Sequence, residues 1–109
     1  MNNSLTNDSH LYFSTRLAME VGLNEAIFLE YLKQHLSKTT IKLDGYSWIC
    51  KTYEEWRQEF PFWSRSTHIR AIKALEDQGL VISTTDFNLH PFDRTKWYRI
   101  DYEKLSELV

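Results

Sequence analysis

The stretch "SRSTHIRAIKALEDQGLV", residues 64–81, carries side chains that suit the binding of a polyanion. At about 100° per residue, Ile72 and Leu75 define the buried face of a predicted helix. The opposite face is expected to carry Ser66, Thr67, Arg70, Lys73, Ala74 and Asp77. Hydroxyls near a helix start can bond phosphate, and long cations further along can reach phosphates or base edges. This face therefore suits the major groove of DNA.

A solvated helix face without any ligand is the simpler alternative for the same residues. Arg65 points toward the buried side, but its place in the first turn leaves it free to reach outward. His68 is expected to face the core as a hydrogen-bonded, semi-buried histidine and not as a base reader. Glu76 and Asp77 lie at the helix end that disfavours negative charge, and the sequence offers no reason for them.

A second basic segment is "DRTKWYRI", residues 93–100. As a strand over 96–100, it alternates its faces, so Tyr98 is expected to point to the core with Ile100. Arg99 and Trp97 then face outward, and Trp97 is expected to cover the edge of the core. Basic side chains on such a hairpin can hold phosphates or enter a minor groove. The candidate contacts are Arg94, Lys96 and Arg99, with Asp93 as a local partner of Arg94.

The charge distribution supports a local basic surface on an acidic chain. The 109 residues carry a formal charge of −2. Residues 64–100 hold six basic and four acidic side chains, a net +2, whereas the remainder holds seven and eleven, a net −4. Because local potential steers a polyanion, the overall charge does not exclude nucleic acid.

The elements that position these residues follow from caps and periodicity. Ser14 is expected to cap a helix over 15–21, and Asn24 to cap a longer one through Leu36. The apolar positions of the longer helix exceed one stripe, so it is either central to the domain or shared with a second copy. A homodimer through Ala26 to Leu36 is the corresponding hypothesis.

The remaining elements are a turn, a strand, two more helices, a hairpin and a last helix. Asp44-Gly45 predicts a turn before a strand over 47–51. Thr52 with Glu55 predicts a capping box, and its helix presents the aromatic core face Tyr53, Trp56 and Phe60. Ser64 caps the next helix through Gln78, strands follow at 80–83 and 96–100, and Asp101 caps a final helix ending near Leu108.

This order predicts an α+β fold, a winged helix-turn-helix with extra N-terminal helices and a C-terminal helix. We expect residues 1–9 to form a flexible N-terminus and 10–109 a single domain. One cysteine, Cys50, and the lack of a signal peptide or long apolar run indicate a cytoplasmic protein. The four histidines are scattered, and no nucleophile motif or phosphate loop occurs. We therefore expect no enzyme, metal or cofactor.

Four segments carry a resemblance to a known family: "GLNEAIFLEYL", "SWICKTYEEW", "FPFWSRSTHIRAIKALEDQGLV" and "DRTKWYRIDYEKL". Over about residues 18–105, the chain resembles the N-terminal winged-helix domain of phage and plasmid replication initiation proteins of Gram-positive bacteria, including the DnaD-like group. The resemblance implies a DNA-binding domain without catalytic activity that sometimes dimerises. It places Arg65, Ser66, Thr67, Arg70 and Lys73 on a recognition helix, and Arg94, Lys96 and Arg99 on the wing.

Two departures accompany the resemblance. The family usually has an aliphatic residue where this chain has His68, and usually continues into a second domain, whereas this chain stops at Val109. It is thus either a fragment or a small protein that kept only the binding module. The expected function is sequence-specific binding of double-stranded DNA in phage or plasmid replication or mobilisation. The alternatives are a module that docks on a host replication or defence protein, and a transcriptional regulator.

Overall fold

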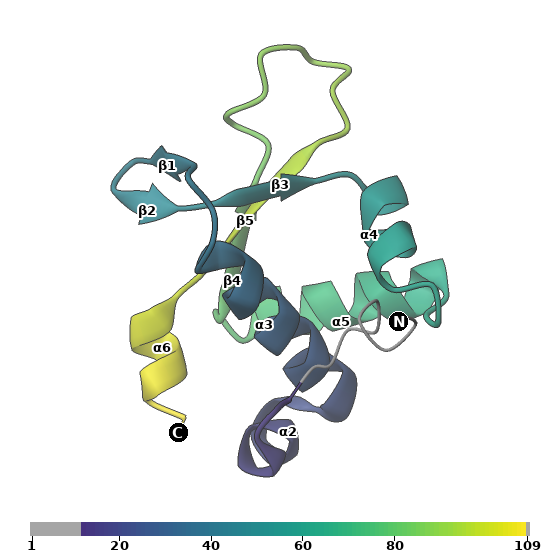
Figure 1. Cartoon of the computed structure of the whole chain (residues 1–109), viewed down its shortest axis with the longest axis vertical. Helices are drawn as coiled ribbons and strands as arrows, with labels where there is room; N and C mark the ends of the chain where they lie inside the picture. The colour runs from purple at the N-terminus through teal and green to yellow at the C-terminus, as the bar shows by residue number, and fades with distance from the viewer. Residues whose placement is uncertain (1–11, 109) are drawn as a thin grey trace, which may run out of the picture.

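The computed structural model describes residues 12–108, and the flexible N-terminus expected over 1–9 lies outside this range. The fold is mixed α+β, with five helices and small antiparallel sheets among the described residues (Figure 1). The helices are α2 (Thr15–Val21), α3 (Leu23–Leu36), α4 (Tyr53–Glu59), α5 (Arg65–Asp77) and α6 (Tyr102–Ser106). The strands are β1 (Lys42–Leu43), β2 (Tyr46–Ser47), β3 (Ile49–Lys51), β4 (Val81–Thr84) and β5 (Lys96–Ile100).

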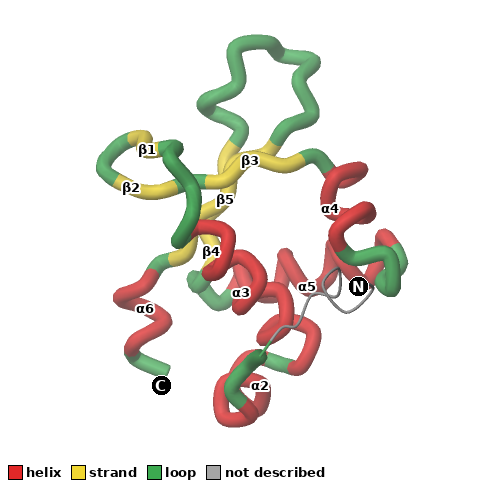
Figure 2. The backbone as a smooth tube through the Cα atoms, viewed as in Figure 1, coloured by secondary structure: helices red, strands yellow, loops and turns green. Residues whose placement is uncertain are grey.

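The main sheet has the strand order β3-β5-β4, and both pairs are antiparallel. Helix α3 packs against α5 and β5, and α5 packs against β4, so the core lies between these helices and the sheet. The connection from β4 to β5 projects from the sheet as a wide loop, at the end of the molecule away from α2 (Figure 2). This arrangement leaves the loop and the outer side of α5 uncovered within the described chain.

The N-terminal helices confirm one predicted cap and correct another. The Ser14 side chain accepts a hydrogen bond from the Leu17 amide at 3.2 Å, as predicted. Asn24 is not a cap, because α3 already begins at Leu23 with Gly22 as its N-cap. Gly22 has φ 105°, a backbone conformation that only glycine adopts readily. One glycine thus both ends α2 and starts α3.

Helix α3 is central to the domain. Five of its apolar side chains are buried in the core: Ala26, Phe28, Leu29, Leu32 and Leu36. Leu23 is 57% exposed, and Ile27 and Tyr31 are half-buried, so a dimer through Ala26 to Leu36 stays a prediction.

The predicted strand over 47–51 is divided in the structure. Trp48 interrupts it, leaving β2 and β3, and β1 forms an additional hairpin with β2. Asp44 and Gly45 have φ of 54° and 81°, which suits a two-residue hairpin turn. The buried Trp48 indole N–H donates to the Leu43 carbonyl at 2.9 Å, which holds this hairpin on the domain.

The other predicted boundaries are close to those observed. Thr52 and Glu55 form the expected capping box, and Trp56 and Phe60 are buried. Ser64 caps α5, which ends at Asp77 followed by Gln78 as C-cap, and β5 has its predicted bounds. Strand β4 is one residue later than predicted, and α6, capped by Asp101, ends at Ser106.

Candidate nucleic-acid interface

Helix α5 has the two faces that its sequence predicts. Ala71, Ile72 and Leu75 are buried in the domain. The exposed side chains on the opposite face are Ser66, Arg70, Lys73 and Asp77, while Thr67 and Ala74 are half-buried. The helix therefore presents hydroxyl and basic groups together on one solvent-facing side.

The hydroxyls at the start of α5 form a small cluster. Ser64 Oγ accepts from the Thr67 amide at 3.1 Å and donates to Thr67 Oγ1 at 2.9 Å. Ser66 Oγ lies 3.2 Å from Ser64 Oγ. Thr67 is thus part of the cap, whereas the exposed Ser66 hydroxyl keeps bonding capacity for a ligand.

The three cations of α5 differ in their surroundings. Arg65 lies over the Tyr53 ring, with Cζ 5.4 Å from the ring centroid, while remaining exposed. Lys73 pairs with Asp77 at 3.3 Å across one helical turn. Both members of this pair are well exposed, so the pair contributes only about 0–1 kcal/mol and can open for another anion. Arg70 makes no ion pair or side-chain hydrogen bond with the described residues.

The acidic residues at the end of α5 now have a structural role. Asp77 pairs with Lys73, and Glu76 accepts a hydrogen bond from the Ser83 hydroxyl of β4. Glu76 also lies 3.5 Å from Lys96 Nζ of β5. Glu76 therefore connects the end of the helix to two strands, and Lys96 already has an anionic partner.

Strand β5 has the predicted alternation. Tyr98 and Ile100 are buried, which confirms their inward direction. The Arg99 guanidinium stacks on Tyr46 of β2, with Cζ 3.7 Å from the ring centroid, a contact that the sequence did not predict. Trp97 packs edge-to-face against Phe87, at a centroid distance of 5.6 Å, and its indole N–H donates to Asn88 at 2.7 Å. Arg99 is thus engaged with an aromatic ring of the β1–β2 hairpin.

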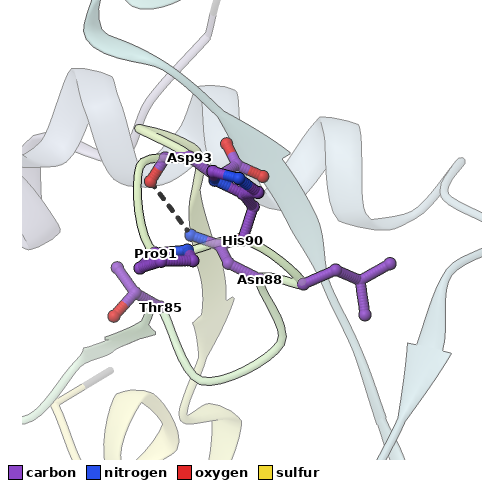
Figure 3. A pocket seen from close by; sticks show the side chains of 6 residues that line it. Thr85, Asn88, His90, Pro91 and Asp93 are labelled. Atoms are coloured by element: carbon purple, nitrogen blue, oxygen red, sulfur yellow. Dashed lines mark hydrogen bonds between the residues drawn. The ribbon is translucent and has the colours of Figure 1, made fainter.

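Between β4 and β5, residues 85–95 form an ordered loop around Asn88. The Asn88 amide nitrogen donates to the Thr95 carbonyl at 2.7 Å. The same nitrogen lies 3.4 Å from the Asp93 carbonyl oxygen (Figure 3). Hydrogen bonds from Thr95, first from its side chain and then from its amide at 2.9 Å, lower the pKa of Asp93. No Asp93–Arg94 ion pair forms among residues 12–108, so the predicted local pair is wrong. Arg94 is exposed and is the loop's one lysine or arginine.

His68 lies on the inner face of α5 and is fully buried, with 1% of its surface exposed. Its ring centroid lies 5.3–5.5 Å from those of Phe28, Trp56, Phe60 and Trp63. The inward direction is confirmed, but the expected hydrogen bond at Nε2 is absent within the described chain. Burial among these rings lowers the pKa of His68 to about 4. His68 is therefore a neutral core residue at pH 7.

The residues missed by sequence reasoning are Tyr46 and Asn88. Tyr46 of the β1–β2 hairpin contacts Arg99 of the main sheet, and no local pattern marks a contact between residues this far apart in sequence. Asn88 lies in a segment rich in turns, where an asparagine side chain often forms hydrogen bonds with nearby backbone groups. The residue type was therefore the sequence signal that could have indicated its role in the loop.

No other site is apparent in the described part of the chain. Over residues 12–108, no group of three or more histidine, cysteine, aspartate or glutamate side chains could hold a metal ion. None of the described helices has the length and apolar character needed to cross a membrane. Comparison with protein-family models, with curated proteins and with solved structures gives no match. The function must therefore be inferred from the surfaces of this fold.

Proposed function

We propose that the domain is a winged helix-turn-helix that binds double-stranded DNA in the cytoplasm, with α5 as its recognition helix. The observation that carries this proposal is the exposed Arg70 guanidinium, which has no protein partner among the described residues. It lies on the same helix face as Ser66 and Lys73. Arginine pairs with two acceptors on guanine in the major groove, so an unpaired arginine here suits base readout.

The order of the elements supports this assignment. Strand β3 leads into α4 and α5, which are followed by β4, a loop and β5, and β5 lies between β3 and β4. In a helix-turn-helix, the second helix reads the major groove while the first crosses the backbone. Helix α5 is that second helix, and its polar face is uncovered.

The candidate contacts differ in how available they are for DNA. Arg65, Ser66, Arg70 and Lys73 are exposed on α5, and Arg94 is exposed on the loop after β4. Lys96 and Arg99 have protein partners in Glu76 and Tyr46. We therefore expect the recognition helix to provide most of the affinity, and the wing to contribute mainly through Arg94.

Replacing Arg70 and Lys73 together with alanine is expected to weaken DNA binding by about 2–3 kcal/mol. Most of the loss should come from Arg70, because Lys73 can remain paired with Asp77 when DNA is absent. The measurement is fluorescence anisotropy with a labelled duplex. The matched control is the double variant Lys33→Ala with Lys38→Ala, which removes the same charge from exposed positions outside α5.

The first experiment is a selection from a random-sequence duplex pool at two salt concentrations, followed by sequencing of the retained DNA. We expect an enriched motif and an affinity that falls as salt rises, because phosphate contacts release counterions. Absence of retention at low salt would instead favour a module that docks on another protein. Equal losses in the α5 variant and the control would mean that binding depends on charge and not on α5.

The enriched sequence would also address the biological setting. A motif matching a phage or plasmid replication or transfer origin would support a role in replication or mobilisation, and one confined to promoters would support a transcriptional regulator. The fold alone does not choose between these roles.

A further inference from the structure

Two lysines lie directly opposite each other in the main sheet. Lys51, the last residue of β3, is in register with Lys96, the first residue of β5. Their neighbours along the strands, Ile49 and Tyr98, are also opposite each other and are buried, so the lysines are on the core-facing side of the sheet. Like charges at such opposed positions destabilise a sheet. The two ammonium groups therefore need anions beside them.

Each lysine has a carboxylate partner from a different helix. Lys51 Nζ lies 2.6 Å from an oxygen of Glu59, the last residue of α4. Lys96 Nζ lies 3.5 Å from an oxygen of Glu76, in the last turn of α5. The Lys51 side chain is 18% exposed, whereas that of Lys96 is 33% exposed. The Lys96–Glu76 pair is thus the longer of the two and has the more exposed cation, so another anion can open it more easily.

The Glu76 carboxylate is fixed in this position although the helix end disfavours it. Negative charge in the last turn of a helix is unfavourable. The Ser83 hydroxyl of β4 donates to Glu76 Oε2, the same oxygen that lies beside Lys96. One carboxylate oxygen therefore accepts from a hydroxyl and an ammonium group, two kinds of donor that also bind the phosphate oxygens of DNA. In the free chain, Glu76 supplies the anion that the two lysines need.

We propose that Lys96, with Lys51 opposite it, is a site for a backbone phosphate of DNA, and that Glu76 fills this site in the free protein. The inference rests on the proposed function and adds a competitor to it, because a phosphate must displace the Glu76 carboxylate before it can bind Lys96. Arg70, on the exposed face of the same helix, has no such competitor among the described residues. Glu76 therefore lowers the affinity for the DNA backbone while it leaves the proposed base contact free.

Replacing Glu76 with glutamine tests the site, because it removes the charge and keeps the shape. The glutamine side-chain oxygen can still accept from the Ser83 hydroxyl, while Lys96 loses its anion. Binding of the full chain to a labelled random-sequence duplex is measured by fluorescence anisotropy over a series of salt concentrations. Glu76→Gln should bind about threefold to fivefold more tightly at low salt. The plot of log affinity against log salt should become steeper by about 0.9, the change expected for one additional phosphate contact.

The matched control is Asp86→Asn, which removes the same charge from an exposed position on the loop after β4. Asp86 forms no ion pair with any residue of the described range, so its replacement releases no cation. The control should change the affinity by less than about twofold, because the field of an exposed charge is screened by salt. Its salt dependence should equal that of the native chain.

A double-variant experiment tests whether the gain comes through Lys96. Lys96→Met removes the ammonium group and keeps most of the apolar stem of the side chain. When Glu76→Gln is added to Lys96→Met, the affinity should rise no more than in the Asp86→Asn control, since no cation is left to be released. Circular dichroism and urea unfolding of each variant check that the fold is retained.

The possible failures of this site and of the proposed function are distinguishable. If neither the native chain nor Glu76→Gln binds the duplex at low salt, the proposed function is wrong and the site with it. If the native chain binds and Glu76→Gln binds no more tightly, with an unchanged salt dependence, the pair with Lys96 only connects α5 to β5 and the site alone is wrong. An equal gain with and without Lys96 would also overturn the site, because it would reflect a general loss of repulsion.

Discussion

Replacing Trp56 with alanine is expected to lower the free energy of unfolding by about 3–5 kcal/mol. Trp56 is 0% exposed and contacts aromatic rings from three other elements and from the C-cap of its own helix. These rings belong to Phe28, Tyr31, Phe60, His68 and Tyr98, at centroid distances of 5.0–6.2 Å. The variant loses these contacts and leaves a cavity that the neighbouring elements cannot fill without moving.

Urea unfolding followed by circular dichroism measures this loss. Domains of this size have a stability of about 5–15 kcal/mol, so the variant is expected to be marginal. The control is Met19→Ala on α2, where the side chain is 87% exposed and the expected change is within about 0.5 kcal/mol. A loss for Trp56→Ala as small as that of the control would mean that the aromatic cluster is not the centre of the core.

The elements with strong local signals could be predicted from the sequence. Ser14, Thr52, Ser64 and Asp101 each cap the helix that they were expected to cap, because a short polar side chain before a helix bonds its free amides wherever the chain lies. The two faces of α5 followed from the same kind of local rule, helical periodicity.

The errors arose where two local signals compete or where the signal is not local. Asn24 is a good cap residue, yet Gly22 takes that position because its positive φ allows two helices to meet at one residue. Strand β1 has two residues, too few to show alternation, and it forms only because the Asp44-Gly45 turn brings it to β2. Both outcomes depend on backbone geometry that residue types suggest only weakly.

In the candidate site, too, the features set by local rules were predicted and those set by tertiary contacts were not. Exposure of Ser66, Arg70 and Lys73 followed from the helix period, whereas the partners of Lys96 and Arg99 did not. Glu76 and Tyr46 are 20 and 53 positions away from those cations in sequence, so only the tertiary fold brings them together. Basic residues on a strand therefore indicate that a basic surface is possible. Whether these residues are free to bind a ligand depends on the side chains that the tertiary fold packs against them.

Acidification from pH 7 toward pH 4 is expected to destabilise the domain by roughly 3 kcal/mol through His68 alone. Burial lowers the pKa of His68 from 6.5 to about 4 in the folded state. Between these values the unfolded chain binds the proton and the folded chain does not. The stabilising contribution of neutral His68 is therefore complete above about pH 6.5 and is lost as the pH falls toward 4.

The measurement is urea unfolding at pH 7 and at pH 4.5 for the native chain and for His68→Leu. Carboxylates also titrate in this range, and burial with nearby Lys51 and Lys38 lowers the pKa of His35 as well. The native chain and the variant share these groups, so the difference between their pH dependences isolates His68. His90→Leu, at an exposed position on the loop, serves as the control and should keep the native pH dependence.

The expected result links the core to the proposed recognition helix. His68 lies on the buried side of α5, among rings from α3, from α4 and from the residues that join α4 to α5. A charged imidazole there has no partner at Nε2 among the described residues, so its protonation favours any state in which α5 moves away from those rings. DNA affinity should therefore fall at low pH in the native chain more than in His68→Leu.

Equal pH dependences for unfolding in the two chains would show instead that His68 titrates normally and that its surroundings admit water.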